Sequence, residues 1–165
     1  MAKPELIQAF NDQIREELNS SYVYLALSAD MDAVGLTGAA AWFRKQSEEE
    51  DGHAMRLYDF VNDVGGHVVL QAIPQPASGV KTLKDAFTKS LAREKHITAC
   101  IHNLVRTARK LDDLSAENFL RWFIEEQVEE EKTASDILTK IELTNGSADA
   151  QYLIDRDLQT RASAE

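Results

Sequence analysis

Apolar residues recur every three or four positions along most of the chain, a spacing that predicts amphipathic helices. In the first expected helix this stripe consists of Ile7, Phe10, Ile14, Ser21, Leu25 and Ser28. The pattern as a whole predicts four long helices and a short fifth one, over about residues 4–34, 38–64, 82–110, 115–145 and 147–158. The chain is therefore expected to be all-α.

Residues that typically start or stop helices mark the expected ends. Pro4 suits a first helical turn, and Gly35 follows the end of the first helix. Residues 82–85, Thr-Leu-Lys-Asp, form a capping box that opens the third helix. Ser115 is the expected cap of the fourth helix, which Asn145-Gly146 ends.

The segment from residue 66 to residue 82 is expected to be extended, because it contains two prolines and several β-branched residues. A helix of about 28 residues is roughly 42 Å long, and about 17 extended residues reach roughly 56 Å. This segment can therefore cross the whole length of a bundle, whereas the short links elsewhere make their flanking helices antiparallel neighbours. We expect a single domain over residues 1–165, a four-helix bundle with one long crossover and a short fifth C-terminal helix.

Composition and charge narrow the classes of function. The 165 residues are 44% hydrophobic, which is enough for one sizeable core. The net charge of −10 argues against nucleic acid as a partner, since binding phosphates needs clustered Lys and Arg, and it suits attraction of cations instead. Cys100 is the only cysteine, so a disulfide or a thiolate zinc cluster within one chain is ruled out.

No stretch of the sequence is apolar and long enough to span a bilayer, and the first residues lack the apolar run of a signal peptide. We therefore expect a cytoplasmic protein without a membrane partner.

Polar residues of the kinds that bind metal lie on the apolar stripe near the middle of each long helix. They are Glu17, Glu50 with His53, Glu94, and Gln127 with Glu130. Residues three apart on a helix share a face, and antiparallel helices with level ends would bring the four groups to one height within roughly 4 Å. The spacing therefore predicts that all six side chains meet in the core.

Several carboxylates in one core would be severely destabilising without cations. Two like charges 4 Å apart repel by roughly 4 kcal/mol at an effective dielectric near 20. Any one of these glutamates, taken alone, is more typical of a solvated face, and His53 alone is more typical of a structural histidine. The coincidence of four helices favours a metal site, and oxygen ligands with a single imidazole fit a dinuclear iron centre.

Other polar features allow two interpretations each. Glu49, Glu126 and Glu129 lie one helical step from the expected ligands, so they form either a third cation site or a solvated face. Tyr24 faces the same way as Glu17 and is either a core aromatic residue or a donor beside the metals. The remaining histidines, His67, His96 and His102, are expected to be surface or structural residues, and Cys100 a small core residue.

These motifs resemble the ferroxidase centre of the ferritin family, specifically its bacterial non-haem members, over nearly all of the chain. The resemblance implies the ferritin-like bundle, one iron held by Glu17, Glu50 and His53, and a second held by Glu94, Glu130 and the shared Glu50. It also implies that Gln127 and Tyr24 lie beside the centre. Glu49, Glu126 and Glu129, together with Glu130, resemble the third iron site of the bacterial branch.

The family's members form hollow shells of twenty-four subunits, oxidise Fe(II) with dioxygen or hydrogen peroxide, and store hydrated ferric oxide. This resemblance therefore implies iron storage, ferroxidase activity and self-association. Haem is not expected, because Asp51 stands where a haem-binding methionine would, and the fourth helix lacks a second Glu-x-x-His. Glu117 matches one acid of the family's three-fold iron channel, but Leu120 replaces another, which leaves the route of iron open.

Two functions of other classes remain open. A di-iron oxidase that acts on an organic substrate would use a similar core, usually with a second Glu-x-x-His and an apolar substrate pocket. A non-catalytic helical bundle or shell subunit would need none of these acids on core faces. Formation of an iron-filled shell and acceleration of Fe(II) oxidation distinguish the three.

Overall fold

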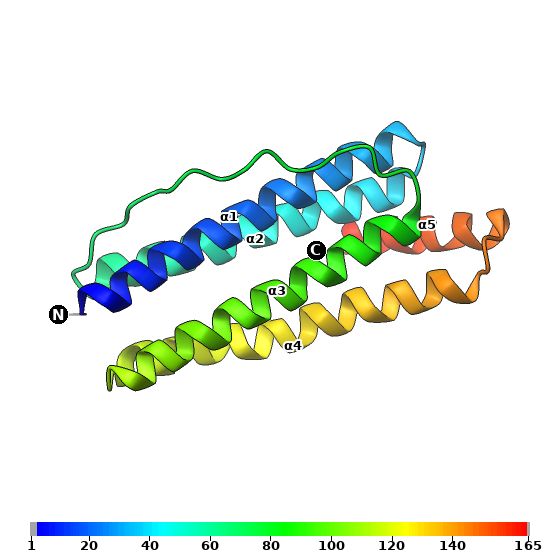
Figure 1. Ribbon diagram of the computed structural model, residues 1–165. Helices are drawn as coiled ribbons and strands as arrows, with labels where there is room; N and C mark the ends of the chain where they lie inside the picture. Colours follow the sequence, from blue (N-terminus) through cyan, green and yellow to red (C-terminus); the bar gives the residue numbers. More distant parts are fainter. Residues whose placement is uncertain (1–2, 165) are drawn as a thin grey trace.

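Five α-helices make up the computed structural model, which describes residues 3–164 (Figure 1). They are α1 (Pro4–Ala33), α2 (Thr37–Asp63), α3 (Leu83–Lys110), α4 (Leu114–Leu143) and α5 (Ala148–Ala162). The predicted all-α, four-helix bundle with a short fifth helix is confirmed. Within residues 3–164, no helix has the length and apolar character needed to cross a membrane.

The long connection between α2 and α3 runs along the outside of α1, as Figure 1 shows. Near one end of α1, the side chain of Asn11 donates to the carbonyl of His67 at 3.1 Å and accepts from the amide of Val69 at 3.1 Å. Near the other end, Asp30 accepts from the amides of Gly79 and Val80 at 3.0 and 2.9 Å. The expectation that this segment crosses the length of the bundle is confirmed.

The helix ends follow the predicted signals with one exception. The Thr82 side chain accepts a hydrogen bond from the Asp85 amide at 3.0 Å and so caps α3. The prediction that Ser115 caps the fourth helix is wrong, because Asp113 does so by accepting from the amide of Ala116 at 3.0 Å. Both residue types are good caps, and the left-handed backbone of Asp112 (φ 53°) turns the chain early enough for Asp113 to take this position.

Two apolar clusters fill the core, one toward each end of the bundle. One contains Leu27, Phe43, Phe87 and Ile137, and the other contains Phe10, Leu57, Ile101 and Phe123. On each of the four long helices, the residues between the two clusters include the polar groups predicted to bind metal. The core is thus two hydrophobic layers separated by a polar one.

The stripe predicted for the first helix is partly wrong. Ser21 and Ser28 face α2, where their hydroxyl groups donate to the carbonyls of Ser47 at 2.8 Å and Ala40 at 2.7 Å. Leu25, on the same side, is 45% exposed. A long helix with two neighbours has a wide buried face, and its centre is marked instead by the fully buried Tyr24 and Met31.

The short helix α5 packs against α2 and extends one turn beyond the predicted end, to Ala162. Among its apolar residues, Leu158 is buried, whereas Tyr152 and Leu153 are each 62% exposed. The carboxylate of Asp155 accepts hydrogen bonds from the amides that open α2. Because α5 uses only part of its apolar surface within the chain, the rest is available to another molecule.

Candidate metal centre

The structure brings all six predicted ligands together in the polar layer between the two apolar clusters. Glu17 comes from α1, Glu50 and His53 from α2, Glu94 from α3, and Gln127 with Glu130 from α4. The three carboxyl groups at positions 17, 50 and 94 are at most 1% exposed. On each helix, the polar group lies on the same face as the apolar stripe. Burial of the apolar residues on the neighbouring turns therefore keeps the polar group in the core.

One half of this centre consists of Glu17, Glu50 and His53. Their ligating atoms all lie within 4.8 Å of one another, and Nδ1 of His53 is 3.4 Å from Oε2 of Glu50. Oε2 of Glu17 and Oε2 of Glu50 are both buried and have no hydrogen-bond partner among residues 3–164. Buried polar atoms are nearly always paired, so two unpaired carboxylate oxygens beside an imidazole fit a bound cation.

The other half is organised around Glu94. The hydroxyl of Tyr24 donates a hydrogen bond to Oε1 of Glu94 and lies 3.1 Å from Oγ of Ser90. Nε2 of Gln127 donates to Oε2 of Glu94 at 3.2 Å. Two fixed donors therefore orient this carboxylate.

The electrostatics of the centre favour a cation. Burial, followed by the charge of Glu50, raises the pKa of Glu17 well above its usual value, and burial together with Glu94 does the same to Glu50. Burial also raises the pKa of Glu94. Burial and the surrounding carboxylates raise the pKa of Glu130 to about 8. A raised pKa makes a carboxyl group easier to protonate, and a bound cation would displace such protons.

The additional acids gather at one side of the centre, around Glu130. The ligating atoms of His53, Glu126 and Glu130 lie within 4.8 Å of one another. The charges of Glu49, Glu126 and Glu129 all contribute to the raised pKa of Glu130. Glu129 is exposed and the other two are half-buried, so a cation held there would be reached from outside the core.

Two residues that touch the centre were not predicted from the sequence. Nε2 of Gln13 donates to Oε1 of Glu17 at 2.9 Å, and both side chains are buried. Their spacing of four residues on one helix is a signal that could have revealed the pair. The ring of Trp122 packs edge-on against the ring of His53, with the ring centroids 5.3 Å apart. This contact joins α4 to α2, so no local sequence pattern indicates it.

The expectation that Cys100 is a core residue is wrong. Its side chain is only half-buried and lies on the face formed by α1 and α3, with Sγ 3.5 Å from Nε2 of His96. The core positions of this part of α3 are occupied instead by Ile97, Ile101 and Leu104. Position 100 lies three residues from Ile97, on the edge of the buried stripe, where a small side chain is accommodated without being covered.

Known proteins resemble this chain over most of its length. A family model described as a ferritin-like domain matches residues 7–144. The bacterial non-heme ferritin of Staphylococcus haemolyticus (strain JCSC1435) is 32% identical over 165 residues, which cover 100% of this chain and 99% of the relative. The bacterial non-heme ferritin of Escherichia coli O157:H7 is 35% identical over 160 residues, 97% of each chain.

Solved structures agree with this similarity. An open pore ferritin from the hyperthermophilic archaeon Archaeoglobus fulgidus superimposes with a TM-score of 0.95. It is 37% identical in sequence, and the alignment covers 96% of this chain and 98% of that one.

Proposed function

The chain belongs to the ferritin family, and on this premise we propose that it oxidises Fe(II) and stores the ferric product. The observation that carries the proposal is the polar layer in the core, where Glu17, Glu50, Glu94 and His53 converge with unpaired carboxylate oxygens. Such a layer costs folding free energy unless cations enter it. A function that needs the cations explains why the core contains this polar layer.

We propose that one Fe(II) is bound by Glu17, Glu50 and His53, and the second by Glu94, Glu130 and the shared Glu50. The close approach of the first three side chains supports the first set. The pKa of Glu50 is raised by both Glu94 and Glu130, which supports its position between the two sets. Iron is here the substrate, held only until it is oxidised.

Three neighbouring side chains position the proposed ligands. Gln13 occupies Oε1 of Glu17 and leaves Oε2 directed at the centre. Tyr24 and Gln127 hold the two oxygens of Glu94. Ligands that are already oriented lose less freedom when the ion binds, so the site recognises iron in a defined geometry.

The reaction follows from the ligand set. Hard carboxylate oxygens stabilise Fe(III) more than Fe(II), so they favour loss of an electron from each ion. Two electrons and two protons convert one dioxygen to hydrogen peroxide, and two more of each convert peroxide to water. The apolar clusters on both sides of the layer limit access of bulk water to the ions.

We further propose a third iron site formed by Glu49, Glu126, Glu129 and Glu130. The effect of the charges of Glu49, Glu126 and Glu129 on the pKa of Glu130 supports it, as does the close approach of the ligating atoms of Glu126 and Glu130. Glu130 would belong to both sites, so iron could pass from the centre toward the exposed Glu129.

The storage proposal is completed by assembly into a closed shell of twenty-four copies in the cytoplasm. Apolar side chains exposed on several helices, among them Leu143, Tyr152 and Leu153, support burial against further copies. A closed symmetric assembly is how identical subunits enclose a volume.

The decisive experiment loads purified protein with Fe(II) in air, follows oxidation by absorbance, and then measures iron across a size-exclusion profile. Rapid oxidation with iron eluting in a large particle supports storage. Rapid oxidation with iron left free would favour a di-iron oxidase of organic substrates. If Fe(II) is oxidised no faster than in buffer alone, the protein is a non-catalytic bundle or shell subunit.

A further inference from the structure

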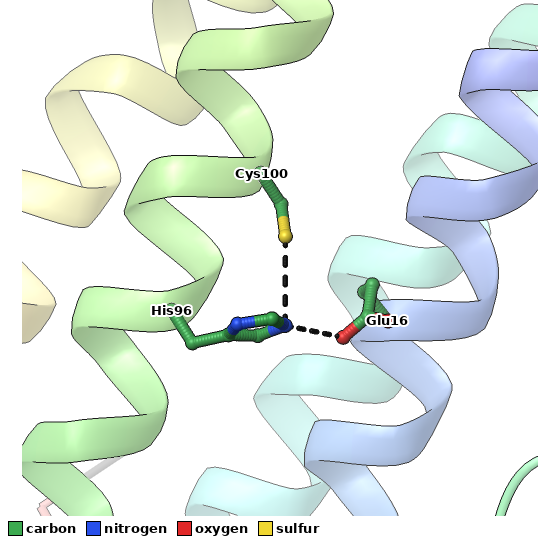
Figure 2. Close-up of side chains that lie close together, drawn as sticks. All are labelled: Glu16, His96 and Cys100. Carbon is green, nitrogen blue, oxygen red and sulfur yellow. Dashed lines mark hydrogen bonds and ion pairs between the residues drawn. The ribbon is translucent and has the colours of Figure 1, made fainter.

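A second group of metal-binding side chains lies on the face of the bundle formed by α1 and α3, outside the polar core layer. Figure 2 shows Glu16 of α1 directed at His96 and Cys100 of α3. Oε2 of Glu16 is 2.8 Å from Nε2 of His96, and Sγ of Cys100 is 3.5 Å from the same nitrogen. The His96 side chain is 51% exposed, so solvent reaches the group.

The group is distinct from the centre described above although it is close to it in sequence. Glu16 precedes Glu17, but successive residues on a helix point about 100° apart. His96 follows Glu94 by two residues and points away from the core. Its exposure contrasts with that of Glu94, which is 1% exposed.

A Cys-His-Glu arrangement could also activate a nucleophilic thiol, but this geometry does not favour it. Such a relay needs the thiol on one ring nitrogen of the histidine and the carboxylate on the other. Here both groups approach Nε2. Burial and the charge of Glu16 also raise the pKa of the Cys100 thiol, which is the opposite of activation.

Three donor atoms that approach one point are instead the arrangement of metal ligands. The ligating atoms of Glu16, His96 and Cys100 lie within 4.8 Å of one another. In a tetrahedral zinc site with ordinary bond lengths, sulfur and nitrogen ligands are about 3.5 Å apart and nitrogen and oxygen ligands about 3.3 Å apart. The sulfur–nitrogen distance already matches, and the oxygen–nitrogen distance needs to widen by about 0.5 Å.

We propose that Glu16, His96 and Cys100 form a separate site for a divalent ion of borderline softness, Zn²⁺, with water as the fourth ligand. Sulfur, imidazole and carboxylate ligands in one set are typical of zinc. A groove of about 230 Å³ adjoins Cys100 and Glu16, with Asn103 and Thr107 on its α3 side, and provides room for the water.

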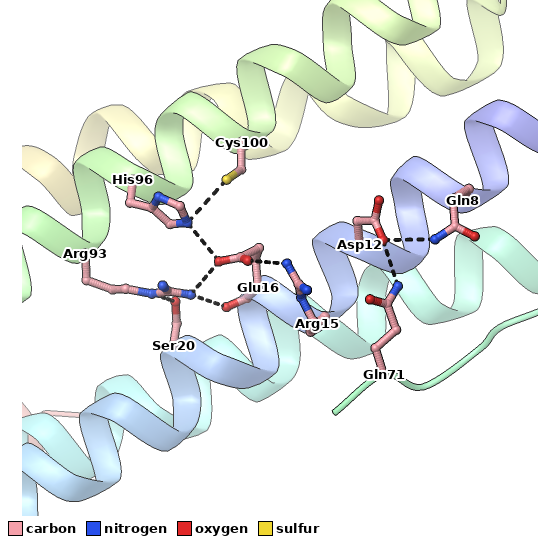
Figure 3. A network of polar contacts seen from close by, with 9 residues as sticks. All are labelled: Gln8, Asp12, Arg15, Glu16, Ser20, Gln71, Arg93, His96 and Cys100. Carbon is pink, nitrogen blue, oxygen red and sulfur yellow. Dashed lines mark hydrogen bonds and ion pairs between the residues drawn. The ribbon is translucent and has the colours of Figure 1, made fainter. Parts of the chain in front are cut away.

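The surroundings hold the carboxylate in place. Figure 3 shows Glu16 accepting from Nη2 of Arg15 at 2.9 Å and from Nη2 of Arg93 at 3.0 Å. Arg93 is itself fixed by donating to Oγ of Ser20 at 2.7 Å. A carboxylate has about four lone pairs, so it can keep both hydrogen bonds while it binds an ion. The positive charges of the two guanidinium groups lower the affinity of the site for a cation. The negative charges of the carboxylate and the thiolate offset this effect.

The test uses the full-length, iron-free protein and Co²⁺ as a spectroscopic probe for Zn²⁺. A thiolate bound to Co²⁺ gives a charge-transfer absorption that carboxylate and imidazole ligands do not give. Cys100 is the only cysteine, so this band reports on this site alone, even when Co²⁺ also fills the core centre. We expect the band in the parent protein and its displacement by Zn²⁺.

Three variants make the result specific. Cys100→Ser removes the thiol and His96→Ala removes the imidazole while keeping the thiol, so both should lose the band. His102→Ala removes an exposed histidine from the same helix and should keep it. Zn²⁺ should also slow the reaction of Cys100 with a disulfide reagent about tenfold in the parent and not in His96→Ala.

Absence of the band in the parent protein, or its persistence in His96→Ala, would overturn the proposal. Circular dichroism of each variant shows that the helices remain, so that loss of the band reports a lost ligand. Ferroxidase activity does not enter this experiment, and its presence or absence leaves the zinc result unchanged.

Discussion

Glu94 is a buried carboxyl group whose two oxygens both accept hydrogen bonds, and His53 is the only imidazole among the proposed iron ligands. Glu94→Ala removes a ligand of one proposed iron, and His53→Ala the nitrogen ligand of the other. We expect both variants to remain helical and to lose rapid oxidation. Stopped-flow absorbance at two Fe(II) per chain measures this.

The matched control for these variants is His102→Ala, which alters an exposed histidine on α3. It should oxidise Fe(II) as fast as the parent protein. Fast kinetics retained in both Glu94→Ala and His53→Ala would show that the proposed centre is wrong.

Glu126 and Glu129 act at the edge of the centre in our proposal. Their replacement by alanine leaves every proposed ligand of the first two irons, so initial oxidation should be unchanged. The ratio of iron oxidised to dioxygen consumed, and the rate after later additions of Fe(II), should change. Glu130→Ala should alter both phases, because this residue belongs to both sites.

An oxygen electrode combined with rapid absorbance over successive Fe(II) additions separates the two phases. If the variants at positions 126 and 129 match the parent in stoichiometry and in the rate after later additions, these acids form only a solvated surface and the third-site proposal is wrong. Glu125→Ala, at an exposed position of the same helix, is the control.

The raised pKa values make the stability of the iron-free protein depend on pH. Glu130, with a pKa raised to about 8, keeps a proton when folded that the unfolded chain loses near its ordinary value of 4.5. Between these values the folded state binds more protons, so the free energy of unfolding falls as the pH rises. Glu17, Glu50 and Glu94 act in the same direction.

We therefore expect the iron-free protein to lose stability from about pH 5 to pH 8, with a shallower loss in Glu130→Gln. Guanidinium denaturation at fixed protein concentration measures the trend. Glu125→Gln should keep the full slope. A stability that rises over this range would contradict the raised pKa values of these buried carboxyl groups.

At the scale of elements, the carboxylate of Asp155 links α5 to the start of α2 by hydrogen bonds. Oδ1 and Oδ2 of Asp155 accept from the amides of Ala39 at 2.8 Å and Gly38 at 3.1 Å. The first amides of a helix have no partner within it, so Asp155 acts as a cap supplied by a distant segment. Gly38 permits this approach, because a Cβ there would lie 1.8 Å from the carbonyl oxygen of Asp155.

We expect Asp155→Ala to destabilise the fold by about 1 to 2 kcal/mol and to expose α5 to proteases. Gly38→Ala should have a larger effect, since the backbone of α5 must move. Asp157→Ala is the control, because Asp157 pairs within α5, with Arg161 at 3.0 Å. Denaturation curves and limited proteolysis report both effects, and a parent-like Asp155→Ala would show that the cap is dispensable.

At the scale of the whole molecule, the folded chain leaves several large apolar side chains exposed at separate places. Val69 and Leu70 lie on the crossover, Leu143 at the end of α4, and Tyr152 and Leu153 on α5. In the proposed shell, these side chains are candidates for contacts between copies.

We expect sedimentation to show one large particle, about 440 kDa for twenty-four chains of 18.5 kDa. Iron-free protein should sediment in the same way, because none of these exposed side chains belongs to the proposed metal centre. A particle below about 100 kDa would refute storage within a shell, whatever the oxidation kinetics show.

The helices and the candidate centre could be predicted from the sequence because both depend on the pattern of residues within single helices. A period of 3.6 residues places Glu17, Glu94 and the Glu50–His53 pair on inward faces, and their mid-helix positions set a common height. The length of the 66–82 segment determined the crossover in the same way. These inferences need only one helix or one loop at a time.

Other features were decided only when the helices packed together. Asp113 rather than Ser115 caps α4 because of how the preceding link turns, and Leu25 is exposed although it lies on the predicted apolar stripe. The group of Glu16, His96 and Cys100 joins residues 80 positions apart across two helices. Such contacts depend on the rotation and separation of neighbouring helices, which many side chains set jointly and no local pattern records.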